Sequence, residues 1–170
     1  MSVIEIIKKR RSIRKYKTNS IPQEIIDELI EALIWAPSAG NLQSRKFYFI
    51  FDEALKTKIA EAAYNQDFIS EAPLVIVGCV DENKIKRYGE RGKNLYGICD
   101  VSASIQNLML VATEKGLGTC WIGGFDENKV KEILNLPTHL RPIVIVPVGY
   151  PAENPKPPKR VSKDEAVEII

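Results

Sequence analysis

The residue types best suited to chemistry gather in two segments near the amino terminus. Residues 10–14 (RRSIR) place three cations and a hydroxyl within one short stretch. Guanidinium groups bind phosphate through paired hydrogen bonds, and a serine hydroxyl adds a further donor. Residues 36–43 (APSAGNLQ) supply side-chain amides and open backbone that can hydrogen-bond a flat heterocycle. The two segments therefore offer complementary chemistry for one ligand with a phosphate and a ring.

Each segment also has an ordinary structural interpretation. The cations at 8–11 suit the carboxyl end of a helix, where the helix dipole favours positive charge. Proline, serine, glycine and asparagine at 37–41 are turn residues in any protein. The ligand-binding interpretation is favoured because one amphipathic helix separates the two segments and a glycine-rich segment, 116–124 (GLGTCWIGG), follows later.

Composition predicts a single folded domain. The chain has 170 residues, 45% of them hydrophobic, and we assign 1–170 to one domain with 151–170 as an extended tail or arm. Its 24 basic and 22 acidic residues nearly cancel, so no nucleic-acid partner is expected. We find no signal peptide and no stretch of ~18 apolar residues, so we expect no membrane span.

The cysteines point to a reducing compartment. Cys79, Cys99 and Cys120 are widely spaced and odd in number, which predicts reduced thiols in a cytoplasmic protein. The only histidine, His139, lies near no pair of cysteines, so no metal site is expected.

Hydrophobic spacing predicts alternating helices and strands. We expect helices over 2–11, 23–35, 54–64, 100–115 and 127–134, and strands over 46–51, 73–80, 119–122 and 142–150. Asp100 is the expected cap of the long helix, whose nearly all-round apolar surface suits a core or an obligate interface. Residues 84–93 are expected to form a mobile surface segment with partial helix. Four of the ten prolines fall in 151–160, which predicts an extended tail, and 161–170 is expected to form a last turn or arm.

Strands separated by helices could indicate a doubly wound parallel fold, but no Gly-x-Gly-x-x-Gly follows the first strand. The three segments instead resemble the signature of the nitroreductase family of FMN-dependent oxidoreductases, and the chain resembles its compact members. That resemblance implies an α+β fold with a mixed, largely antiparallel central sheet flanked by helices. It also implies an intertwined homodimer whose subunits share two flavin sites.

The resemblance assigns phosphate and ribityl contacts to the first segment and to the tail. Arg10, Ser12 and Arg14 would hold the phosphate and ribityl chain, and Arg11 would lie near the ribityl chain and the ring. A late basic pair, Lys159 and Arg160, would reach the same phosphate, with Lys156 as a competing candidate. A solvated tail is the alternative for that pair.

The resemblance assigns the ring contacts to three further segments. The partner subunit would lay Ser38, Ala39, Asn41 and Gln43 against the flavin ring, and Gln66, or alternatively Asn65, would contribute an amide. The backbone of Ile122, Gly123 and Gly124 would approach the ring near N5, because glycine permits a close approach. Many relatives follow the glutamine of the loop with proline and an aromatic residue, whereas this chain has Ser-Arg-Lys at 44–46.

The implied activity is a two-stage hydride transfer. NADH or NADPH would reduce the FMN, and an electron-poor acceptor such as a nitroaromatic compound or a quinone would then be reduced in a ping-pong mechanism. No catalytic side chain is expected, and the short lid at 81–96 predicts an open, permissive site. Three alternatives stay open: a specialised flavoenzyme such as a reductive dehalogenase or substrate dehydrogenase, a non-catalytic FMN sensor or carrier, and a protein without flavin.

Overall fold

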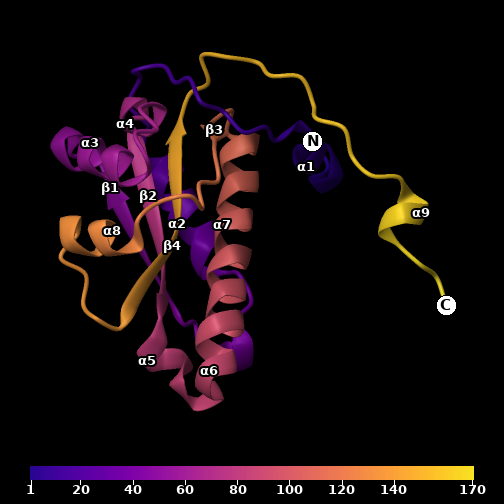
Figure 1. Cartoon of the computed structure of the whole chain (residues 1–170). Helices are drawn as coiled ribbons and strands as arrows, with labels where there is room; N and C mark the ends of the chain where they lie inside the picture. The colour runs from indigo at the N-terminus through magenta and orange to yellow at the C-terminus, as the bar shows by residue number, and fades with distance from the viewer.

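A four-stranded antiparallel sheet forms the centre of the protein, and the computed structural model describes it with all of residues 1–170 (Figure 1). The strands follow the order β1-β2-β4-β3, and their bounds are Arg45–Ile50 (β1), Leu74–Asp81 (β2), Gly118–Thr119 (β3) and Leu140–Gly149 (β4). All three ladders are antiparallel, and the single parallel contact is an isolated bridge between Ser12 and Thr119. The α+β fold with a mixed, largely antiparallel sheet is therefore confirmed.

The chain also forms nine α-helices, most of which pack around this sheet. They are α1 (Val3–Lys9), α2 (Gln23–Ile34), α3 (Glu53–Ala62), α4 (Phe68–Glu71), α5 (Glu82–Ile85), α6 (Gly89–Arg91), α7 (Gly97–Glu114), α8 (Glu127–Ile133) and α9 (Lys163–Ala166). Short side chains fix where several of them begin. Ser2 and Glu5 form a reciprocal capping box on α1, while Asp52 and Asp126 accept backbone N–H groups at the starts of α3 and α8.

The sheet separates two hydrophobic cores. Helices α2 and α7 cover one face, and α3, α4 and α8 cover the other (Figure 1). Strand β2 lies between both layers, and all its residues from Leu74 to Val80 are buried. Alternate side chains enter opposite cores, so that Leu74 and Ile76 pack toward α7 while Val75 and Val77 pack toward α3. Burial on both faces explains why this strand is a continuous apolar run.

The predicted start of the long helix is wrong. Helix α7 begins at Gly97 and follows directly on helical turns that start at Glu82, so Asp100 lies inside its first turn instead of capping it. The preceding turns already continue the helical backbone, and no side-chain cap is needed there. Residues 84–93, expected to be only partly helical, belong to this series of turns. The Asp100 carboxylate therefore does not cap α7 and accepts hydrogen bonds from another segment of the chain.

Two further expectations differ from the structure. The strand expected over 119–122 shrinks to the two residues of β3 and an isolated bridge between Ile122 and Ile145, because Cys120 and Trp121 between them pair with no strand and Trp121 is exposed. The helical stretch Glu82–Glu114, in contrast with the sequence-based expectation, is long and apolar enough to cross a membrane by length and composition. However, 44% of its most apolar window is buried inside the protein, and Val101, Ile105 and Leu108 belong to the hydrophobic core on the α2 and α7 face of the sheet.

Pro151, Ala152 and Glu153 still bond to residues 14–16, and the residues after them, up to 170, leave the body of the protein. Their backbone is extended apart from the single turn of α9, and the arm runs past α1 to a distant carboxyl terminus (Figure 1). Four apolar side chains on this arm are exposed: Val161, Val167, Ile169 and Ile170. The arm therefore buries none of its apolar end against its own chain.

Candidate functional site

The segment 10–14 is held in place by the edge of the sheet. The Ile13 N–H donates to the Thr119 carbonyl at 2.9 Å, and the Ile13 side chain is buried against Gly118. Because side chains alternate along an extended chain, burial of Ile13 turns Ser12 and Arg14 the other way. The β3 edge thus presents the polar residues of this segment together.

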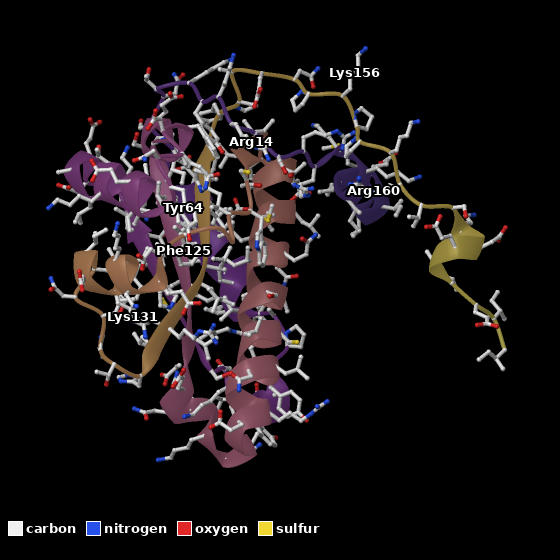
Figure 2. All side chains as sticks on the ribbon, in the orientation of Figure 1. Arg14, Tyr64, Phe125, Lys131, Lys156 and Arg160 are labelled. Atoms are coloured by element: carbon white, nitrogen blue, oxygen red, sulfur yellow. The ribbon has the colours of Figure 1, made fainter.

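These residues line a pocket of about 310 Å³ whose side chains are cationic or polar apart from two prolines. The carboxyl-terminal arm closes the pocket from the other side, and its lining residues are Arg10, Arg11, Ser12, Arg14, Pro155, Lys156 and Pro158. Figure 2 shows Arg14 above the sheet, with Lys156 and Arg160 on the arm that leaves the body. Lys156 therefore lines the pocket, whereas Lys159 and Arg160 do not.

Positive charge accumulates in this pocket. Partial burial lowers the pKa of Arg10, and the neighbouring charges of Arg160 and Arg11 lower that pKa further. Arg10 has no acidic partner within ion-pair distance. An anion bound here would offset the mutual repulsion of these cations, which is the electrostatic requirement of a phosphate site.

Arg11 has a structural task at this pocket. Its Nη1 donates to the carbonyls of Lys8 at 2.6 Å and Arg10 at 2.8 Å, where α1 ends. These bonds satisfy carbonyl groups that the helix leaves without partners. The guanidinium group thus lies at the helix end while Arg11 also lines the cationic pocket, and its contact with a ribityl chain and ring stays a prediction.

Gly118 gives a direct test of this anchoring. A methyl group there would lie 2.6 Å from Cγ1 and 2.8 Å from Cβ of Ile13, too close for the neighbour to remain in place. We expect Gly118→Ala to lower the free energy of unfolding by about 1–3 kcal/mol through overpacking and to displace Ser12 and Arg14. Urea unfolding and a phosphate-ligand titration would measure both effects. Unchanged values would show that Ile13 does not anchor the segment.

The second polar segment forms a tight loop after α2. Ala39–Asn41 is a 3₁₀ turn, and Gly40, Asn41 and Gln43 have left-handed φ angles of 55°, 54° and 49°. The Ser38 hydroxyl accepts the Gln43 N–H at 3.0 Å, which closes the loop. The side chains of Asn41 and Gln43 are exposed and free to face a ligand.

The loop and the cationic pocket lie at opposite ends of α7. Asp100 in the first turn of this helix accepts the Ala39 N–H at 2.8 Å, whereas Ser12 pairs with Thr119 just beyond the last turn. From residue 100 to residue 114 the helix rises by ~21 Å. Within one chain, the two segments are therefore kept apart.

The lid packs on this loop. A methyl group on Gly40 would overlap the guanidinium group of Arg87 and the hydroxyl of Tyr88. Tyr88 in turn meets Tyr96 edge to face, with ring centroids 5.3 Å apart. Residues 81–96 therefore form an ordered cover with cationic and aromatic side chains beside the loop.

The glycine-rich segment forms an open backbone edge. Ile122 is buried and exchanges two 3.0 Å backbone hydrogen bonds with Ile145, which fixes the position of the next residues. A methyl group at Gly123 or Gly124 would meet no atom closer than 3.9 Å, so space lies beside both residues. Neither glycine N–H has an acceptor within the chain. This edge can donate backbone hydrogen bonds to a ligand.

Gln66 joins this edge, whereas Asn65 does not. The Gln66 side-chain amide donates to the Ala63 carbonyl at 2.8 Å and to the Gly124 carbonyl at 3.3 Å. Asn65 has a left-handed φ of 58° after α3 and lines a different, polar pocket between α3 and α8. Gln66 is therefore the amide that lies beside the glycine edge, and the flavin contact of Gln66 or Asn65 stays a prediction. Figure 2 shows Tyr64 and Phe125 close to this junction.

The segments 10–14 and 120–124 are neighbours through β3. Burial raises the pKa of the Cys120 thiol, and the charge of Arg14 and a hydrogen bond with Ser12 partly oppose that shift. The guanidinium carbon of Arg14 also lies 6.0 Å from the ring centroid of Phe68, just after Gln66. One chain therefore contributes the cationic pocket and the open glycine edge side by side.

The buried environments of Cys79, in the core of the sheet, and of Cys120, in the glycine-rich segment, predict low thiol reactivity. Burial raises the pKa of Cys79 to about 12, so about one in ten thousand of its thiols is ionised at pH 8. Cys120 is also buried with a raised pKa. We expect an alkylating reagent to leave both unmodified in the native protein and to modify both in denaturant, as measured by peptide mass spectrometry. Rapid native labelling of Cys120 would contradict this and would argue for a redox role.

The protein has an α+β fold, with an antiparallel sheet between helical layers. Its cationic pocket and open glycine edge suit a ligand with an anionic end and a flat end. The nitroreductase family model matches residues 7–66 and 61–150, and the chain belongs to the nitroreductase family.

Named relatives support this assignment. The chain is 35% identical over 159 residues to a protein of Methanothermobacter thermautotrophicus assigned as an NADH dehydrogenase/NAD(P)H nitroreductase, covering 91% of this chain and 80% of the relative. It is 32% identical over 165 residues to a Bacillus subtilis FMN reductase (NAD(P)H), covering 89% and 66% respectively. The structure of the Vibrio harveyi NADPH:FMN oxidoreductase complexed with NAD⁺ superposes with a TM-score of 0.91 at 28% identity, covering 98% of this chain and 76% of that protein.

Proposed function

We propose that two copies of this chain bind FMN at their interface and transfer hydride from NADH or NADPH to an electron-poor acceptor by a ping-pong mechanism. NAD(P)H-dependent flavin oxidoreductase activity is the function of the nitroreductases and FMN reductases to which the chain is related. The proposal of a shared site rests on one observation: the loop 37–43 and the cationic pocket lie at opposite ends of α7. A second copy can bring its loop to the pocket of the first.

The residues present fit FMN. Arg10, Ser12, Arg14 and Lys156 would hold the phosphate in the cationic pocket, with Arg160 adding positive charge nearby. The open edge at Gly123 and Gly124 has space and two free N–H donors for a flat ring. When bound, FMN supplies the capacity to accept hydride from a nicotinamide and to pass it on.

The chain's own part is to hold and cover the ring. Backbone N–H groups at 123–124 would donate to it and stabilise added negative charge. Ser38, Ala39, Asn41 and Gln43 of the second copy would cover it, while Gln66 fixes the glycine edge through the Gly124 carbonyl. The site residues include no histidine and no acid, so we propose that solvent supplies the protons.

Two surfaces support the homodimer. An apolar groove of about 580 Å³ lies between α1, α2 and α7, and its hydrophobic lining consists of Val3, Ile6, Ala32, Trp35, Leu110 and Val111. Trp35 is 76% exposed in the single chain. The apolar end of the arm likewise has no surface of its own chain to cover it. A second copy that receives the arm and covers the groove would bury both, as obligate interfaces do. We place this dimer in the cytoplasm, in keeping with its unpaired cysteines.

Absorbance spectroscopy tests the proposed function. The purified protein, with FMN added if necessary, is mixed anaerobically with NADH and then with NADPH. Rapid bleaching of the flavin band by either donor is expected and would identify the preferred one. A bound flavin that stays oxidised with both would favour a sensor or carrier, and the absence of FMN binding would refute the proposal. Light scattering with absorbance on the same sample would reveal whether the flavin-containing species is a dimer.

A further inference from the structure

A cluster of buried polar side chains lies where α7 begins. Ser44, Arg45 and Asp100 are 0%, 8% and 4% exposed, respectively. Charged groups are costly to bury unless hydrogen bonds and opposite charges compensate them. All three belong to stretches that the proposed flavin contacts do not use.

The Asp100 carboxylate accepts two hydrogen bonds from the loop 37–43 and the residue that follows it. One carboxylate oxygen accepts the Ala39 N–H at 2.8 Å, and the other accepts the Ser44 hydroxyl at 2.5 Å. The loop residues are 61 and 56 positions away in the sequence, so α7 holds the middle and the end of the loop through a single side chain. Such charged hydrogen bonds are short and strong in a buried setting.

Arg45 secures the other end of the loop. Its guanidinium group donates to the carbonyls of Ile34 at 2.9 Å, Ala36 at 2.7 Å and Pro37 at 3.0 Å. These carbonyls end α2 and begin the loop, where helical partners are missing. Burial lowers the pKa of Arg45, and the charge of Asp100 opposes that shift, as expected for neighbouring opposite charges.

The loop needs support from outside. Asn41 and Gln43 are non-glycine residues with left-handed φ angles, a conformation that persists only when the surroundings enforce it. Ser44 and Arg45 follow the loop directly in the sequence, and together with Asp100 they supply that support through hydrogen bonds.

We propose that Asp100 is a positioning residue of the flavin site, and that with Ser44 and Arg45 it holds the loop 37–43 in the shape that covers the flavin ring of the second copy. The inference rests on the proposed function. Asp100 touches no ligand itself and acts through the Ala39 backbone and the Ser44 hydroxyl.

Three substitutions remove different numbers of the hydrogen bonds between Asp100 and the loop, and FMN affinity measures the effect of each. Asp100→Ala removes both bonds, and we expect the FMN dissociation constant to rise about 10-fold or more. Asp100→Asn keeps one acceptor and offers an N–H to the Ser44 oxygen, so its dissociation constant should lie between those of the wild type and Asp100→Ala. Ser44→Ala removes a single bond and should have a smaller effect. At saturating FMN, the visible circular dichroism of the flavin should change in the same order, because it reports on the contacts around the ring.

The matched control is Thr113→Val. Thr113 is also buried in α7, and its hydroxyl donates to the Met109 carbonyl at 2.8 Å, but it lies at the opposite end of the helix from the loop. Its loss should lower the melting temperature without changing FMN affinity or the dichroism of the bound flavin.

Several outcomes would overturn the positioning role. They are a folded Asp100→Ala dimer with unchanged FMN affinity and dichroism, an Asp100→Asn variant no better than Asp100→Ala, or a Thr113→Val variant with the same flavin changes. If Asp100→Ala does not fold, Asp100→Asn and Ser44→Ala still decide, because unchanged flavin properties in both would refute the role. A wild-type protein that binds no FMN would instead refute the proposed function, so the two failures are distinguishable.

Discussion

Replacing Arg10 and Arg14 together by alanine is expected to raise the dissociation constant for FMN by about 100-fold or more. Each guanidinium group that binds a phosphate contributes about 1.5–3 kcal/mol, because a charged hydrogen bond is lost together with the compensation of the anion. The two single variants should each lose about 10-fold. Quenching of flavin fluorescence in titrations of the apoprotein would measure these constants.

Riboflavin binding shows whether the two arginines act on the FMN phosphate or on the rest of the binding site. Riboflavin has the ring and the ribityl chain of FMN but lacks the phosphate, so its weaker affinity should change little in the double variant. Lys15→Ala is the matched control, since Lys15 lies in the same exposed stretch, carries the same charge and does not line the pocket. An equal loss of riboflavin and FMN affinity would show that the arginines act on the ring or on the fold.

Removing residues 161–170 is expected to weaken the dimer and to release FMN. Every residue of this segment is exposed in the single chain, so its loss should leave the fold of that chain intact. Burial of its four apolar side chains on a second copy would contribute about 3 kcal/mol or more, which corresponds to a dimer dissociation constant at least about 100-fold higher. Sedimentation over a range of protein concentrations would detect the shift, and absorbance would follow the flavin in each species.

Point variants distinguish packing from mere chain length. Ile169→Asp should reproduce most of the truncation effect by placing a charge in the apolar interface. Glu168→Ala, its neighbour on the arm, should leave the dimer unchanged. A truncated protein that remains a fully flavinated dimer would show that the arm is not part of the interface.

The site segments could be predicted from sequence because each is a local pattern. Cations around Ser12, turn residues around Gly40 and glycines at 123–124 are contiguous in the chain, and the hydrophobic spacing of β2 or α2 is equally local. Strand order could not be predicted from periodicity, and the family resemblance implied only that the sheet is mixed and largely antiparallel. The resemblance also suggested the site residues, whose roles remain proposals.

The buried cluster at Asp100 could not be predicted because its partners lie more than fifty positions away. An aspartate near the start of an apolar helix is typical of a helix cap, and only the helical turns before Gly97 exclude that role. The sequence offered Lys156 only as a candidate that competes with Lys159 and Arg160 for the phosphate. Its spacing from the other cations in the sequence is uninformative, and only the path of the arm over residues 10–14 brings it to the pocket.

Because loop and pocket lie at opposite ends of α7, mutations in two different subunits would combine in an unusual way. In a dimer with two shared sites, each copy would lend its pocket to one site and its loop to the other. A copy damaged in the pocket, paired with a copy damaged in the loop, would concentrate both lesions in one site and leave the other wholly intact. Mixed dimers of two inactive variants would then recover activity, so this fold permits complementation between alleles that a self-contained active site would forbid.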